Sequence, residues 1–138
     1  MKNIIALLLL AAAACGCQTA LVYTGGVKAA DNQKAVAVSK TIEAEYAKQG
    51  LQLESDFPAP PDSSYSTDWI KPVGNTHGIT LGVVNWVKGD TVFIRIEPQP
   101  GCNDVSQEFG EHMRSFMATN FADAKWKLEP RSEADWFR

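Results

Sequence analysis

The sequence has few of the residues that most often carry enzyme chemistry. Its 138 residues include 2 histidines and 3 cysteines. Two of the cysteines, Cys15 and Cys17, lie at the end of an apolar N-terminal segment, which leaves Cys102 as the one thiol in the rest of the chain. Within residues 18–138 this thiol has no second cysteine with which to form a disulfide, so we expect the fold to depend on burial and hydrogen bonding for its stability.

The chain also lacks a basic run and, after residue 17, a long apolar run. It has 13 Lys and Arg residues against 16 Asp and Glu, with a formal net charge of −3. Because no basic cluster is present, we expect neither nucleic acid nor anionic lipid headgroups to be bound through charge. No stretch beyond residue 17 approaches the roughly 20 apolar residues of a membrane-spanning helix.

The N-terminal segment has the order of a secretory signal. Lys2 supplies a positive charge, residues 4–14 form an apolar run, and small residues then lead into cysteine. This run is too short to span a bilayer. Because a cysteine ends it, the leader resembles a bacterial lipoprotein signal peptide, whose lipobox ends at the acylated cysteine. An ordinary secretory leader with incidental cysteines is the alternative.

Two frames fit the lipobox. The run AAAC ends at Cys15 and lacks the favoured Leu, whereas ACGC ends at Cys17 and places Gly before the cysteine. We expect acylation at Cys17, with Cys15 as the alternative. The resemblance then implies a signal peptide over residues 1–16 and anchoring through two or three acyl chains. Since Gln18 and not Asp follows, it also implies the outer membrane, with the protein facing the periplasm.

The first helix is expected over residues 31–49. Apolar residues recur there at spacings of three and four, which is the pattern of an amphipathic helix. Asp31 or Asn32 is a suitable N-cap. Gly50 stands where a left-handed residue commonly ends a helix.

A second helix is expected to begin near residue 103 and to run to about Asn120. Asn103 or Asp104 can cap it, and its apolar residues form one stripe that faces a core. Residues 125–129 then alternate between apolar and polar side chains. This alternation predicts a short strand that Pro130 ends.

A β-hairpin is the clearest feature of the sequence. Two runs of β-branched and aromatic residues, 79–87 and 91–97, are separated by a KGD turn. Pairing Trp86 with Phe93 places both on one face. A slip of one residue would scatter the apolar set over both faces. The opposite face then carries six apolar residues and one polar residue, Asn85. The apolar residues are Leu81, Val83, Val87, Val92, Ile94 and Ile96.

Residues 17–30 are interpreted as the lipidated N-terminus followed by a tether. The Gly25-Gly26 pair interrupts any regular structure there. A short strand over residues 19–24 is the alternative, because apolar and small side chains alternate in that stretch.

Residues 54–77 are expected to form a long loop. They contain four prolines among serines, glycine and asparagine, and proline removes backbone donors. Loops of this length in compact domains tend to be functional or disordered. We expect Tyr65, Trp69 or Ile70 to pack over Trp86 or Phe93, which would make the loop a lid over that face of the hairpin.

Together these elements predict an α+β fold with a single domain over residues 31–138. The order is α-β-β-α-β, with a further strand in front if residues 19–24 join the sheet. Each helix has one apolar stripe, so both are expected on one face of a small antiparallel sheet. The longer version resembles the ferredoxin-like order of elements, a likeness that implies no function.

Candidate catalytic residues are few. Cys102 precedes the second predicted helix, whose dipole favours a reactive thiolate, and His112 or His77 is the available base. In a straight helix His112 lies roughly 14 Å away, too far for proton transfer. Glu108 and His112 offer a carboxylate and an imidazole to a metal. However, the sequence EFGEH lacks the second histidine of HExxH, so we expect no metal and no cofactor.

The aromatic residues are candidates for a binding surface. Tyr65, Trp69, Trp86 and Phe93 combine large contact area with, in three of them, a polar group. We therefore expect a non-enzymatic lipoprotein that binds or scaffolds another envelope component, either a protein or peptidoglycan. A thiol- or metal-dependent hydrolase using Cys102 and His112 is the alternative, and a small-ligand-binding module is the third interpretation.

Overall fold

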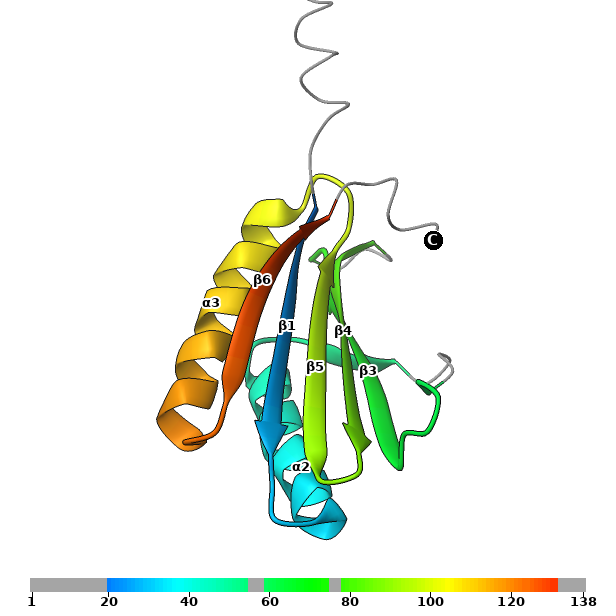
Figure 1. The fold of residues 1–138 in the computed structure, drawn as a ribbon. Helices are drawn as coiled ribbons and strands as arrows, with labels where there is room; N and C mark the ends of the chain where they lie inside the picture. Colours follow the sequence, from blue (N-terminus) through cyan, green and yellow to red (C-terminus); the bar gives the residue numbers. More distant parts are fainter. Residues whose placement is uncertain (1–19, 55–58, 75–77, 132–138) are drawn as a thin grey trace, which may run out of the picture.

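A computed structural model describes residues 20–54, 59–74 and 78–131 (Figure 1). Within these residues the chain forms two helices and six strands. Their order is β1 (Ala20–Lys28), α2 (Asn32–Lys48), β2 (Gln52–Glu54), β3 (Tyr65–Pro72), β4 (Ile79–Lys88), β5 (Thr91–Pro98), α3 (Asn103–Asn120) and β6 (Lys125–Arg131).

The strands form one antiparallel sheet in the order β2-β3-β4-β5-β1-β6. Both helices lie against the same face, α2 on β4 and β5, and α3 on β1, β4 and β5 (Figure 1). The predicted α+β class is confirmed. The predicted order lacked β2 and β3, and its optional first strand is present as β1.

The β4–β5 hairpin has the predicted register. Trp86 lies opposite Phe93, and Val87 lies opposite Val92. All seven residues predicted for the other face are buried. All of them except Asn85 belong to the apolar core, which also contains residues of both helices. Alternating polarity was therefore sufficient to place this hairpin on its core.

Helix α2 begins and ends where its capping residues predicted. Asp31 is the N-cap, and its Oδ1 accepts a hydrogen bond from the backbone N of Lys34 at 2.8 Å. Gly50 has a φ of +84°, a conformation that glycine adopts without strain. Ile42 and Tyr46, from the predicted apolar stripe, are fully buried beneath the helix.

Helix α3 has the predicted extent but a different cap. Cys102 occupies the N-cap position without a side-chain capping hydrogen bond. The prediction that Asn103 or Asp104 caps the helix is therefore wrong. Asp104 lies in the first turn, where its negative charge still interacts favourably with the helix dipole.

Residues 20–28 form a strand, and the tether predicted there is wrong. Gly25 and Gly26 do not interrupt β1, and they lie opposite Ile94 and Phe93 of β5. The strand pairs with β5 on one side and β6 on the other, so two ladders hold it. This pairing offsets the roughly 0.5–1 kcal/mol that a glycine costs inside a strand. Residues 17–19 lie outside the described residues.

Residues 54–77 do not form one long loop. Strand β3 occupies Tyr65–Pro72 and pairs with β4 along its length, with one register shift near its end. Pro60 and Pro61 precede the strand and Pro72 is its last residue, so none of them removes a donor from its interior. Residues 55–58 and 75–77 of the expected loop lie outside the described residues.

Strand β6 begins at the predicted residue and continues beyond the predicted end. Pro130 lies within it, opposite Leu21 of β1. Because β6 is at the edge of the sheet, the missing N–H of a proline need not interrupt its pairing. The prediction that Pro130 ends the strand is therefore wrong, because β6 extends two residues beyond position 129.

Candidate functional site

The face of the sheet turned away from the helices carries side chains of four neighbouring strands. Successive side chains of a strand alternate between faces, so the neighbours of the buried residues point to this second face. We call it the open face, because neither described helix covers it (Figure 1). It includes Thr24, Gly26, Ser66, Asp68, Ile70, Gly82, Val84, Trp86, Phe93, Arg95, Glu97 and the buried Val22.

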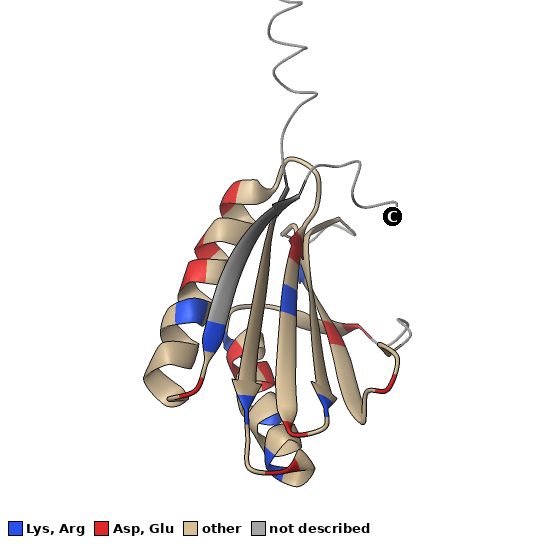
Figure 2. Cartoon of the chain, in the orientation of Figure 1, with Lys and Arg blue, Asp and Glu red and all other residues tan. Residues whose placement is uncertain are grey.

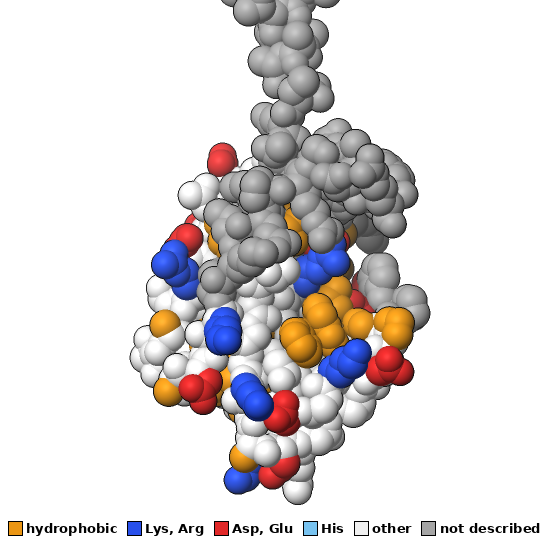
Figure 3. Space-filling model, viewed as in Figure 1, with side chains coloured by type: hydrophobic (Ala, Val, Ile, Leu, Met, Phe, Trp, Pro, Cys, Tyr) orange, Lys and Arg blue, Asp and Glu red, His pale blue; other side chains and the backbone are white. Residues whose placement is uncertain are grey.

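Trp86 and Phe93 form the aromatic centre of the open face. Their ring centroids are 5.4 Å apart and the ring planes differ by 18°, which is a stacked arrangement. Both side chains are half-buried. Figure 3 shows an apolar patch over the middle of this face, with charged side chains around it. Such an aromatic pair contributes about 0.5–1.5 kcal/mol beyond its buried area.

Three shallow hollows lie on the described part of the open face, and two of them border a ring of the aromatic pair. One of about 440 Å³ lies beside Phe93, where Gly26 has no side chain to fill it. Another, of about 470 Å³, lies between Trp86 and residues 59–61. The third, of about 220 Å³, lies over Gly82. The open face is therefore uneven, and the aromatic rings stand between its depressions.

Charged groups of both signs lie beside the rings. Arg95 Nε is 2.5 Å from Glu97 Oε1, and about a third of each side chain is exposed. Burial, and then the negative charge of Glu54, raise the pKa of Asp68 above its ordinary value. An apolar centre within a charged rim is the usual anatomy of a surface that binds a partner.

Two of the predicted binding residues belong to this face and two do not. Trp86 and Phe93 lie together on it, as the alternation predicted. Tyr65 and Trp69 point to the helices: Tyr65 Oη donates a hydrogen bond to Glu43 at 2.8 Å, and the Trp69 ring lies 5.8 Å from that of Tyr46. The prediction of one surface made of all four aromatic residues is therefore wrong.

The prediction that Tyr65, Trp69 or Ile70 forms a lid over the aromatic pair is wrong, because Tyr65 and Trp69 point to the helices. Ile70 lies on the open face, but it pairs with Gly82 and lines the third hollow, which neither ring borders. The loop residues that border the same hollow as Trp86 are Ala59, Pro60 and Pro61. The proline-rich segment therefore flanks the aromatic pair at one side.

A buried carboxylate between α2 and the sheet escaped prediction. Glu43 is 7 % exposed and accepts hydrogen bonds from Tyr65 Oη, from Thr67 Oγ1 and, at 3.5 Å, from Asn85 Nδ2. Burial and the bond to Glu43 raise the pKa of Tyr65 to about 12. The one signal in the sequence was Asn85, a polar residue in an apolar set. The hydrogen bonds of Glu43 join α2 to β3 and β4. Glu43 borders none of the three hollows, so we assign it a structural role.

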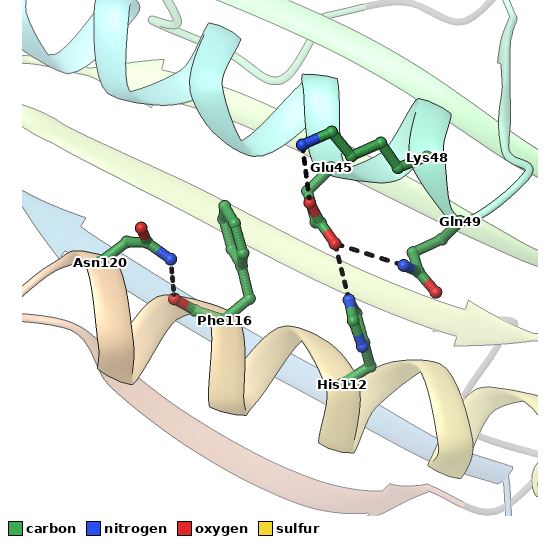
Figure 4. A network of polar contacts seen from close by, with 6 residues as sticks. All are labelled: Glu45, Lys48, Gln49, His112, Phe116 and Asn120. Carbon is green, nitrogen blue, oxygen red and sulfur yellow. Dashed lines mark hydrogen bonds and ion pairs between the residues drawn. The ribbon is translucent and has the colours of Figure 1, made fainter.

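Cys102 and His112 do not converge. Cys102 is the N-cap of α3 and His112 lies ten positions further on, which corresponds to about 15 Å along a helix. His112 Nε2 is instead 2.8 Å from Glu45 Oε1 on α2, where Gln49 Nε2 also donates at 3.2 Å and Lys48 Nζ approaches the other oxygen at 3.8 Å (Figure 4). The His112 hydrogen bond is the main cause that lowers the pKa of Glu45. This pair therefore links the two helices.

Neither a metal site nor a membrane-spanning helix is found in the described part of the chain. His77 lies outside the described residues. The carboxylate that contacts the His112 ring belongs to Glu45 and not to Glu108. In residues 20–54, 59–74 and 78–131, no three His, Cys, Asp or Glu side chains gather to hold a metal ion. Neither helix of that part of the chain has the length and apolar character needed to cross a membrane.

Comparison of the chain with protein-family models, with curated proteins and with solved structures gave no match.

Proposed function

We propose that this chain is a lipid-anchored protein of the bacterial cell envelope whose domain binds another envelope component through the open face. The observation that supports it most is the half-buried Trp86–Phe93 stack, on a sheet face that neither described helix covers. The leader that ends at Cys17 supports the anchor, and Gln18 supports an outer-membrane location facing the periplasm.

An extended partner suits this face better than an enclosed small molecule. The three hollows are spread over a half-buried sheet face, whereas small-ligand sites usually bury most of the ligand within one cleft. Trp86 is of the residue type most enriched among energetic hot spots of interfaces. A segment of an envelope protein or a peptidoglycan strand is the kind of partner that we propose.

The alternative, a hydrolase that uses Cys102 and His112, has weaker support. The two residues are separated along one helix, and the imidazole is hydrogen-bonded to Glu45. Cys102→Ser should therefore leave the cellular phenotype of the protein unchanged. Loss of the phenotype with an unchanged melting curve would favour the enzyme over the binding protein.

Site-specific crosslinking in cells tests the open face directly. A photoreactive amino acid at position 93 should form adducts, whereas the same amino acid at Gln107, on the exposed side of α3, should not. Digestion of the adducts with a muramidase or a protease separates peptidoglycan from protein partners. Trp86→Ala should reduce the adducts from position 93 by roughly 30-fold, the loss expected for a hot spot of about 2 kcal/mol. Equal yields at positions 93 and 107 would contradict the proposal.

A further inference from the structure

The start of β1 marks one end of the sheet. Tyr23 lies opposite Ile96, so Ala20 lies three residues further toward the end where β5 stops. At that end the backbone N of Gln99 donates to the carbonyl of Thr80 at 2.9 Å, which brings the start of β4 alongside. Helix α3 begins there as well (Figure 1). We call this the anchor end, since the cysteines of the leader precede it in the chain.

The connections at the anchor end have no formal charge apart from the histidine they contain. The β3–β4 connection reads PVGNTHG and the β5–α3 connection reads QPGC, without Lys, Arg, Asp or Glu. Val73, in the first of them, is one of the two large apolar residues exposed in the described chain, at 45 %. Lys71 and Asp104 flank these connections, and Arg131, the last residue of β6, lies opposite Ala20 at the same end.

The opposite end of the sheet is rich in charge. Lys28 Nζ lies 3.8 Å from Asp90 Oδ2, and Lys88 Nζ lies 4.0 Å from Asp62 Oδ2. Figure 2 shows basic and acidic residues gathered at this end, on the turns and on α2. The domain is therefore polarised along its strands, with the charged turns far from the start of β1.

The stretch of chain between the acylated cysteine and β1 is shorter than the domain. Ala20 follows Cys17 by three positions, a reach of at most about 10 Å, and follows Cys15 by five positions, a reach of about 17 Å. Strand β4, with its 10 residues, is about 33 Å long. With either cysteine acylated, the bilayer surface lies within reach of the anchor end and beyond reach of the other.

We propose that the anchor end rests on the phospholipid headgroups of the membrane that holds the acyl chains. This placement rests on the proposed function, because it requires the anchor. Uncharged turns lose less hydration at a headgroup surface than charged ones. The charged turns then stand about 30 Å away, several screening lengths of about 8 Å from an anionic surface. The strands then run near the membrane normal. The open face is perpendicular to the membrane surface and is accessible from the periplasm.

Depth-dependent fluorescence quenching tests this placement on the acylated full-length protein. The protein is placed in vesicles of phosphatidylethanolamine and phosphatidylglycerol that contain a lipid with a nitroxide headgroup. A fluorophore is attached at Val73→Cys or at Lys88→Cys, each in a Cys102→Ser background with an unchanged melting curve. Quenching at position 73 should exceed that at position 88 by at least about threefold, given the length of the strands between them. Equal quenching, or stronger quenching at position 88, would overturn the placement.

Two further measurements separate this placement from the proposed function. Fatty-acid labelling and vesicle flotation are measured on the same samples, and protein without acyl chains overturns the anchor and the placement together. Acylated protein with equal quenching overturns the placement alone. As a matched control, a Gly/Ser spacer of about 12 residues is inserted between Gln18 and Thr19. It should lower quenching at position 73 toward the level of position 88, because a flexible linker no longer holds the domain at the surface.

Discussion

Gly110 of α3 lies directly against the ring of Tyr23 of β1, and this contact makes a sharp test of the packing. A Cβ added to Gly110 would lie 2.8 Å from three ring carbons of Tyr23. Tyr23 is 1 % exposed, so its ring cannot move aside without displacing other groups or becoming exposed. Helix propensity alone predicts the opposite effect, because alanine is about 1 kcal/mol more favourable than glycine inside a helix.

We expect Gly110→Ala to lower the free energy of unfolding by about 2 kcal/mol. Overpacking a well-packed core costs about 1–3 kcal/mol, and three short contacts with a rigid ring place this site at the upper end of that range. The gain in helix propensity, about 1 kcal/mol, offsets part of that cost. The variant should therefore be less stable although its helix is intrinsically better.

Urea unfolding followed by tryptophan fluorescence measures this difference. Ser115→Ala, on the exposed side of the same helix, is the matched control and should stabilise by a few tenths of a kcal/mol, since it adds propensity without a contact. In a Tyr23→Leu background Gly110→Ala should lose most of its cost, because the ring is gone. An increase in stability for Gly110→Ala in the wild-type background would contradict the close packing of α3 on β1.

Three other predictions concern the hairpin, the anchor and the link between the helices. Ile94→Ala should cost about 2–5 kcal/mol in urea unfolding because Ile94 is 1 % exposed in the core, and an unchanged value would contradict the register. Cys17→Ala should abolish fatty-acid labelling and membrane association while Cys15→Ala leaves both intact; loss of labelling with Cys15→Ala alone would show that the other frame is used. Because the His112 hydrogen bond lowers the pKa of Glu45, the ionised carboxylate stabilises the fold above its ordinary pKa of 4.5, and this contribution is lost as the pH falls through the lowered pKa. Glu45→Gln should therefore destabilise the protein at about pH 7 and have little effect near pH 2, and equal effects at both pH values would refute this.

Elements with a strong local pattern were predictable from the sequence. The β4–β5 hairpin alternates β-branched and polar residues around a tight turn, and one register alone places Ile94 and its neighbours on a single face. Helix α2 has a capping residue at Asp31 and a left-handed glycine at position 50. These signals act over a few residues, so they are readable without the rest of the fold.

The sequence offered a shorter β1 only as an alternative to a tether and did not predict β3, because the stability of both strands comes from distant partners. Gly25 and Gly26 are poor strand residues, yet β1 is held between β5 and β6. Proline-rich sequence around β3 concealed a strand that pairs with β4 from Tyr65 onward. Since β3 was expected to be a loop, no alternation could assign Tyr65 and Trp69 to a face, and their place on the helix side was missed.

By itself the sequence determined the elements whose pattern is local: the two helices, the β4–β5 hairpin, and the side of that hairpin on which Trp86 and Phe93 lie. Tertiary structure alone decided what those elements contact. It paired His112 with Glu45, 67 positions away, and Glu43 with Tyr65, 22 positions away, and it left the aromatic pair on a face without a helix. The physical reason is that hydrophobic periodicity specifies which face of an element is buried but not its neighbour, whereas a hydrogen bond between distant side chains depends on the position of both elements.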